Sequence, residues 1–229
     1  SQLKNLRGLR VYGERVTGRF LETLSQAVPK PQLRSLNLAG SSITSTDLQP
    51  VANFTDLVSL DLSDTLVDDD GLCALSGLTQ LARLDLSYTR VTDQGLSHLK
   101  GLTRLSDLNL SHTRVRGAGV AQLCDARLSS LDLSVTKITD SDALGLARAG
   151  MNGLLTLNLS RTKVSRVPGL STALRTLDMS GTRMADDGLI EFIQSSHTAS
   201  VTRLVLSETN VSDVSTKDLG KLTELRQLG

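Results

Sequence analysis

Leu81–Val91 has the sequence LARLDLSYTRV and shows the pattern that decides the fold, Leu-x-x-Leu-x-Leu-x-x-Thr-x-Val. Within it, Leu84 and Leu86 flank a polar residue, as expected of a strand that buries one face. The pattern also stands on both sides of this stretch, at Leu57–Val67 and at Leu105–Val115. Because one such strand cannot bury its face alone, the repetition predicts a stack of parallel strands.

Copies of the pattern cover the whole chain of 229 residues, at intervals of 20 to 27 residues. Nine full copies begin at residues 6, 33, 57, 81, 105, 128, 154, 174 and 201, and a tenth begins at 225 and is cut off after Leu228. We therefore predict one solenoid segment over residues 1–229. Neither end carries the polar capping layer that a solenoid end needs, so we expect the parent protein to continue in both directions.

The pattern resembles the leucine-rich-repeat family, and the resemblance covers essentially the whole chain. It implies an α/β fold, a horseshoe or arc with a parallel β-sheet on the concave side and short helices or turns on the convex side. Many family members have asparagine at pattern position nine, where this chain has Thr65, Thr89, Thr113, Thr136, Thr162, Thr182 and Thr209. Such repeats are similar to the cysteine-containing subclass of F-box proteins, with Thr in place of Cys, and to kinetoplastid and some bacterial arrays.

A threonine hydroxyl can donate one hydrogen bond and accept two, so it can do part of the work of that asparagine in less space. Glu14 and Ser41 occupy the position in the first two copies and predict less regular layers there.

The second half of each repeat predicts a short convex helix, as in Val91–Leu96 (VTDQGL), where Thr or Asp is a natural N-cap. The repeat that begins at Leu154 has only 20 residues and contains Pro168-Gly169, which predicts a tight turn instead of a helix.

The composition excludes several classes of protein. With 25 basic and 24 acidic residues the net charge is +1, and nothing predicts a nucleic-acid partner. No apolar run is long enough to cross a membrane. Cys73 and Cys124 lie two layers apart on the convex side, too far to bridge, so we expect packed, reduced thiols in an intracellular, cytoplasmic protein.

Each pattern position becomes a column on the surface of a solenoid, and three columns carry candidate partner-binding residues. Position eight is the most variable and supplies Tyr88, His112 and Arg161 as anchors. Position five, in mid-strand, supplies Asp85, Asn109 and Asp132. Position ten supplies an electrostatic rim, Arg90, Arg114, Lys137 and Lys163. The alternative is a solvated face, in which the position-five residues serve local hydrogen bonding and pair with the basic column at little net energy.

No catalytic or metal-binding constellation is present in the sequence. His98, His112 and His197 fall in different repeats, and the aspartates of position five recur as consensus without singling out one pair. We therefore expect neither an enzyme nor a cofactor.

The leading hypothesis is a protein–protein scaffold that binds its partner on the concave face. Two alternatives stay open from the sequence. One is the substrate-recognition segment of a ubiquitin ligase or a similar recruiter, implied by the F-box resemblance. The other is a structural component of a large assembly, cytoskeletal or otherwise.

Overall fold

The computed structural model describes residues 3–149, 151–167, 171–195, 198 and 200–229. In this part of the chain, ten short strands form one sheet, and each strand pairs in parallel with the next one along the chain. The strands are β1 (Gly8–Arg10), β2 (Ser35–Asn37), β3 (Ser59–Asp61), β4 (Arg83–Asp85), β5 (Asp107–Asn109), β6 (Ser130–Asp132), β7 (Thr156–Asn158), β8 (Thr176–Asp178), β9 (Arg203–Val205) and β10 (Gln227–Leu228).

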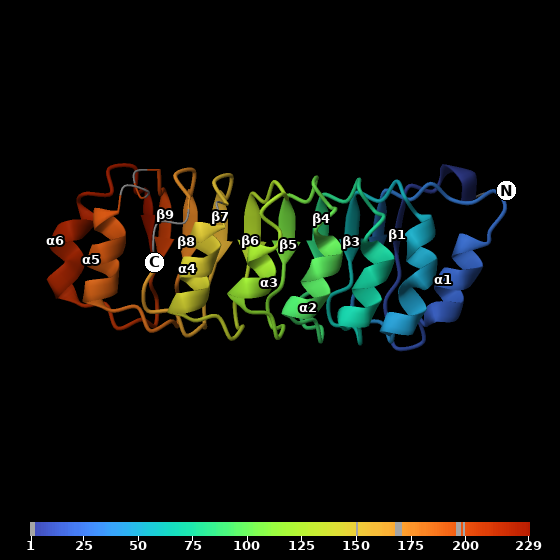
Figure 1. The fold of residues 1–229 in the computed structure, drawn as a ribbon, viewed down its shortest axis with the longest axis horizontal. Helices are drawn as coiled ribbons and strands as arrows, with labels where there is room; N and C mark the ends of the chain where they lie inside the picture. Colours follow the sequence, from blue (N-terminus) through green and yellow to red (C-terminus); the bar gives the residue numbers. More distant parts are fainter. Residues whose placement is uncertain (1–2, 150, 168–170, 196–197, 199) are drawn as a thin grey trace.

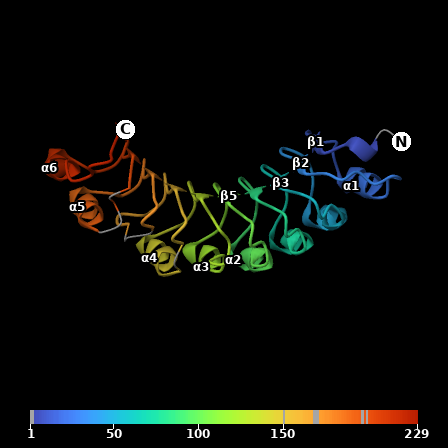
Figure 2. The ribbon, with the colours of Figure 1, turned by 90° about the horizontal axis from the view of Figure 1, so that it is seen from above.

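The register of the sheet follows the leucine pattern without slippage. Leu60 pairs with Leu84, Leu84 with Leu108 and Leu108 with Leu131, so position four always faces position four of the next layer. Seen from above, the chain forms an arc, with the strands along the inner side and the helices along the outer side (Figure 2). The predicted parallel solenoid is therefore confirmed.

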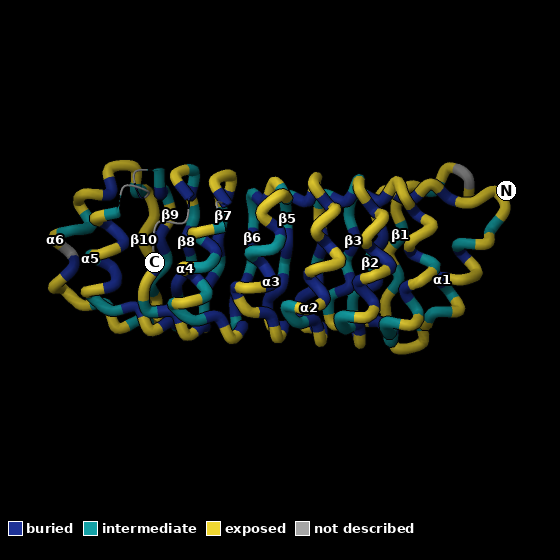
Figure 3. The backbone as a smooth tube through the Cα atoms, viewed as in Figure 1, coloured by how far each residue is buried: buried dark blue, intermediate teal, exposed yellow. Residues whose placement is uncertain are grey.

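Columns of buried leucines form the core between the sheet and the helices. Figure 3 shows the backbone of the buried positions in dark blue, recurring from layer to layer. Pattern positions one, four, six and eleven point into the core. In the layer of β4 these positions are Leu81, Leu84, Leu86 and Val91, and each is at most 2% exposed. The layers repeat this arrangement, so each core leucine packs on equivalent residues above and below. A narrow stack of identical layers needs no large aromatic side chain, in keeping with an aromatic content of 2%.

The position-nine hydroxyl closes the turn after each strand. Thr89 Oγ1 donates to the Leu86 carbonyl at 2.6 Å, and the other position-nine threonines repeat this bond at the same length. Ser41 Oγ donates to the Leu38 carbonyl, also at 2.6 Å, so the prediction that Ser41 interrupts this series is wrong. The serine hydroxyl reaches the same carbonyl because only the oxygen, and not the threonine methyl, makes the bond. Glu14 is exposed.

Short helices cover the convex side, as Figure 1 shows. The α-helices are α1 (Gly18–Ser25), α2 (Asp93–Leu96), α3 (Gly117–Ala121), α4 (Asp140–Arg148), α5 (Asp186–Gln194) and α6 (Thr216–Leu219). The 3-10 helices are η1 (Leu3–Asn5), η2 (Ser45–Asn53), η3 (Asp69–Leu75), η4 (Ser97–Leu99) and η5 (Asp213–Ser215). Among the described residues between β7 and β8 there is no helix, as the short repeat predicts, while Pro168-Gly169 lies outside those residues.

The helix N-termini carry the predicted caps in several layers. The Thr92 side chain accepts a hydrogen bond from Gln94 N, and the Asp68 side chain accepts one from Asp70 N. Thr139 forms a capping box with Asp142, whose carboxylate accepts from the Thr139 backbone N–H at 2.9 Å. Arg116 and Ala185 stand at the same place before α3 and α5 without a side-chain cap, so capping helps these helices but packing on the core decides them.

Candidate interaction surface

The position-five side chains are held by hydrogen bonds within the sheet. Asp85 Oδ1 accepts from Ser87 N at 2.8 Å and from Ser87 Oγ at 2.6 Å, which closes the first bend after β4. Asn109 Oδ1 accepts in the same way from Ser111 N, and Asp132 Oδ1 accepts from Ser134 N. The local hydrogen bonding named above as the alternative for this column is thus present.

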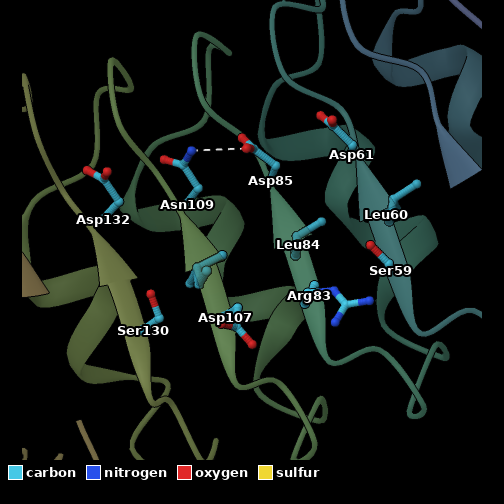
Figure 4. A pocket seen from close by; sticks show the side chains of 11 residues that line it. Ser59, Leu60, Asp61, Arg83, Leu84, Asp85, Asp107, Asn109, Ser130 and Asp132 are labelled. Carbon is cyan, nitrogen blue, oxygen red and sulfur yellow. Dashed lines mark hydrogen bonds between the residues drawn. The ribbon is translucent and has the colours of Figure 1, made fainter. Parts of the chain in front are cut away.

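Amide and carboxylate side chains of this column also pair between layers. Asn109 Nδ2 donates to Asp85 Oδ2, and Asn158 Nδ2 donates to Asp132 Oδ2, each at 3.0 Å. Figure 4 shows the first of these bonds on the concave side of the strands. Where an Asn stands next to an Asp in this column, as at Asn109 and Asn158, the amide therefore takes the place of a second carboxylate and removes the repulsion between the two layers.

A shallow hollow of about 380 Å³ lies on the concave face over β3, β4, β5 and β6. Its charged lining consists of four carboxylates and one guanidinium, those of Asp61, Asp85, Asp107, Asp132 and Arg83 (Figure 4). The predicted residues Asp85, Asn109 and Asp132 therefore lie together in an acidic depression, and each already has a hydrogen-bond partner in the protein.

The position-eight residues lie in the turns beyond the strand ends, at the edge of the sheet. The strands end at position five, so Tyr88, His112 and Arg161 do not lie within the concave sheet itself, and the prediction needs this correction. The turn follows from the Asp85-type bend, which carries the chain out of the sheet before the threonine returns it to the core. A partner bound on the concave face would contact these side chains at the rim of that face.

The backbone at position eight is left-handed in every layer from the first copy to the ninth. Gly13, Gly40 and Gly181 have φ values of 104°, 65° and 63°. The other layers have non-glycine residues with φ between 53° and 57°, namely Asp64, Tyr88, His112, Val135, Arg161 and Glu208. The variable column of the sequence is therefore a row of turns, which we call the turn row, in which glycine would be the least strained residue.

Neighbouring turns in this row are linked through their backbones. Tyr88 N donates to the Ser111 carbonyl at 3.0 Å, and His112 N donates to the Ser134 carbonyl at 3.0 Å. This spacing brings the side chains of adjacent layers into contact: the rings of Tyr88 and His112 are stacked, with centroids 3.9 Å apart and planes 14° apart. Tyr88 is nevertheless 56% exposed, so the stack presents an aromatic surface to solvent.

The position-ten cations stand two residues further along, on the same edge. Arg90, Arg114, Lys137 and Lys163 are exposed. In the part of the chain that the structure describes, none of them forms an ion pair, and the ion pairs found involve Arg166 and Lys221 instead. The alternative in which this column pairs with the position-five carboxylates is therefore wrong, because those carboxylates bend back to their own turns.

A further set of carboxylates, at the helix starts, escaped the sequence prediction. Asp93 Oδ1 accepts from Arg116 N of the next layer at 2.7 Å, and the Asp140 carboxylate accepts from Ser165 N, Ser165 Oγ and Arg166 N. Asp69 and Asp186 make equivalent bonds. The sequence did contain a signal for these carboxylates, because Asp recurs at the second residue after the eleven-residue pattern. Their hydrogen bonds, however, join neighbouring layers and cannot be predicted from spacing within one repeat.

These bonds lower the pKa of both Asp140 and Asp93, but burial opposes them and the net shifts of the two carboxylates have opposite signs. Burial raises the pKa of Asp140, but the hydrogen bonds from Ser165 and Arg166 outweigh it and leave the pKa below its usual range. Burial also raises the pKa of Asp93, and there its effect exceeds that of the hydrogen bonds from Arg116 and Gly119.

We expect Asp140→Asn to destabilise the protein at pH 7 by about 1 kcal/mol, because an amide cannot accept all three bonds. A lowered folded pKa means that the unfolded chain binds the proton more tightly, so the contribution of Asp140 is complete above about pH 5 and is lost progressively as pH falls further. Urea unfolding followed by circular dichroism at pH 7 and pH 3 should show the difference between variant and wild type shrinking at pH 3. An equal difference at both pH values would contradict the assignment, and Asp93→Asn, with its oppositely shifted pKa, is the control.

The described cysteines and histidines, Cys73, Cys124, His98 and His112, form no second site. Cys73 and Cys124 are free, as expected, but both are exposed, so the prediction that they pack as small apolar residues is wrong: the leucines fill the core and leave the thiols on the outer helical surface. His112 belongs to the turn row, His98 is exposed on η4, and His197 lies outside the described residues. Within the described ranges no group of three or more His, Cys, Asp or Glu side chains could hold a metal ion.

A model of the leucine-rich repeat matches residues 78–100 and 171–192. Together with the buried leucine columns and the unbroken register, this match decides the family. The chain is a leucine-rich-repeat protein. The comparisons do not test its resemblance to the cysteine-containing F-box subclass, which stays a prediction. A search of curated proteins gave no match.

Solved structures share the fold of this leucine-rich-repeat protein. An internalin (inlF) from Listeria monocytogenes has a TM-score of 0.68 and 22% identity over 86% of this chain, which spans 54% of that structure. An internalin C2 from the same organism has a TM-score of 0.59 and 23% identity, with 97% and 79% covered. TLR13 in its complex with ssRNA13 has a TM-score of 0.72 and 20% identity, with 99% and 32% covered.

Leucine-rich-repeat proteins generally act as protein-interaction scaffolds, and their repeat domains are typically non-enzymatic. Because one similar structure is an RNA complex, the expectation that nucleic acid is not a partner stays a prediction. No helix in the described ranges has both the length and the apolar character needed to cross a membrane.

Proposed function

We propose that this leucine-rich-repeat protein binds a protein partner across the concave sheet and the adjoining turn row. The observation that carries the proposal is the left-handed backbone of the turn row, where six layers have a side chain instead of glycine. A left-handed non-glycine residue costs about 1 to 2 kcal/mol, and such strain is concentrated at binding and catalytic sites.

The side chains in these strained positions have the properties of a contact surface. Tyr88 and His112 stack on each other and are solvent-exposed, so the cost of ordering the tyrosine ring is met before a partner arrives. Tyrosine and arginine are also the residues most enriched among binding hot spots, and Arg161 lies two layers further along the same row. Val135, in the layer between His112 and Arg161, is β-branched and has a φ of 54°, which is an unfavourable combination.

Replacing Tyr88 by glycine tests the proposal without disturbing the scaffold. Glycine suits the left-handed backbone, so we expect Tyr88→Gly to keep or slightly raise the thermal midpoint of unfolding while it removes the aromatic surface. Recovery of partners in a pull-down from cells of the source organism, quantified by mass spectrometry, should fall about tenfold, the loss typical of one hot-spot residue.

The matched control is Tyr12→Ala, which removes the other tyrosine of the chain, 76% exposed in the first layer and outside position eight. This control should recover the same partners as the wild type. Unchanged recovery with Tyr88→Gly, or an equal loss with Tyr12→Ala, would remove the turn row as the binding surface.

A further inference from the structure

A strip of uncompensated positive charge runs along the edge of the turn row. It consists of the position-ten residues of five consecutive layers, Arg90, Arg114, Lys137, Lys163 and Arg183, and of Arg161 at position eight, and we call it the basic edge. All six side chains are exposed, and within the described residues none of them takes part in an ion pair. Because the net charge of the protein is only +1, the acidic residues that balance these six positive charges must lie elsewhere in the protein.

The basic edge has sharp ends. In the layer before it, Asp64 and Leu66 stand at positions eight and ten, and in the layer after it the same positions are occupied by Glu208 and Asn210. Between these layers, positions eight and ten contain no acidic residue. The aromatic stack of Tyr88 and His112 lies at the end of the strip nearer to the amino terminus.

The nearest recurrent carboxylates are already engaged. Those of Asp93, Asp140 and Asp186 follow the strip at the helix starts, and each accepts hydrogen bonds from the backbone of the next layer. The acids of the concave hollow, such as Asp85 and Asp132, accept bonds from their own turns. The cations of the basic edge are therefore left for a partner.

The cations are held at the spacing of the layers. Arg90 N donates to the Val67 carbonyl at 2.9 Å, and Arg114 N and Lys163 N donate to the equivalent carbonyls of the layers before them at 3.0 Å. One cation per layer gives a repeat of about 4.8 Å at the backbone. This repeat is close to the pitch of an α-helix, about 5.4 Å, and the long Lys and Arg side chains can take up the difference over five layers.

We propose that the basic edge binds an acidic helical segment of the protein partner, with about one carboxylate per helical turn facing it. The inference rests on the proposed function and adds the chemistry of the partner. An extended acidic strand fits less well, because its side chains on one face recur about every 6.6 Å. The low net charge of the protein disfavours a nucleic acid as the partner.

Fluorescence anisotropy with labelled probes tests this. The first probe is an alanine-based helical peptide of about 20 residues with Glu at i, i+4, i+7 and i+11, long enough to be helical alone. The second has the same composition with Glu scattered around the helix, and the third is an oligothymidylate of similar charge. We expect the striped peptide to bind most tightly, and more weakly as salt is added.

Charge reversal on the protein locates the contact. Arg114→Glu/Lys137→Glu should weaken binding of the striped peptide at least about tenfold. The matched control, Arg19→Glu/Lys100→Glu, makes the same change in net charge at two exposed residues of the helical side and should leave binding within about twofold of wild type.

Three results would overturn the inference: equal binding of the striped and scattered peptides, binding of the oligonucleotide as tight as that of the striped peptide, or equal losses in the two charge-reversed proteins. If these occur while partner recovery still depends on Tyr88, the proposed function stands and only the acidic helical partner falls. If recovery is independent of Tyr88, the turn row fails as the partner site whatever the peptides do.

Discussion

Leu131→Ala is expected to lower the free energy of unfolding by about 2 to 5 kcal/mol, the range for truncating a fully buried leucine. Leu131 lies in the middle of β6, is 1% exposed and pairs with Leu108 on one side and Leu157 on the other. In a solenoid each layer is stabilised mainly by its two neighbours, so a cavity in a central layer weakens both interfaces. The neighbouring leucines cannot easily move to fill this cavity, because the register of the sheet holds them in place.

Urea unfolding followed by circular dichroism measures this loss, and Leu155→Ala is the matched control. Leu155 precedes the next strand of the sheet and is 42% exposed, so its truncation removes the same atoms without opening a cavity. We expect a change below about 1 kcal/mol for the control. Similar losses for the two variants would show that the leucine columns do not carry the stability of the stack.

Gly119→Ala is expected to destabilise the protein by about 2 to 3 kcal/mol, although alanine is the better helix former. Gly119 lies in α3, and a Cβ at this position would be 2.6 Å from the Cα of Asp93 in the preceding layer. Backbone atoms cannot move aside as the end of a side chain can, so the layers would have to separate. Separation would also stretch the hydrogen bond from Arg116 N to Asp93 that joins the same two layers.

Gly145→Ala makes the same substitution in α4, where no atom lies within 4 Å of the added carbon. There the only effect is on helix propensity, and we expect a gain of up to about 1 kcal/mol. Opposite signs for the two variants in the same unfolding assay would establish that Gly119 is required by the contact between layers. A gain at both positions would contradict that contact.

Residues that act within one repeat were predictable from the sequence. The alternation around Leu84 determines a short strand, the recurrence of the pattern determines a parallel stack, and the caps Thr92 and Asp68 mark the starts of helices. These features depend on residues two to four positions apart, whose geometry the backbone sets locally. The hydrogen bond of the position-nine threonine was predictable for the same reason, because the Thr89 hydroxyl donates to the carbonyl of Leu86, three residues earlier.

Of the candidate site, the sequence indicated the residues but not their geometry. The glycines at positions 13, 40 and 181 were the available sign that position eight is left-handed, and they stand in the same column as Tyr88. Variability alone suggested anchors for a partner on the concave face, and it did not show that these residues lie in turns. The sequence likewise could not show that the position-five acids turn back to their own bends, or that the cations of the basic edge form no ion pair with any described residue.

By itself, then, the sequence determined the repeat, the inward leucines and the side-chain columns from which we predict a partner surface. Only the tertiary structure decided how the columns meet: the stacked rings of Tyr88 and His112, the bonds from Asp93 and Asp140 to the next layer, and the close approach at Gly119. The physical reason is distance along the chain. Contacts within a repeat follow from local backbone geometry, whereas contacts between residues 23 to 26 positions apart depend on how closely the layers stack.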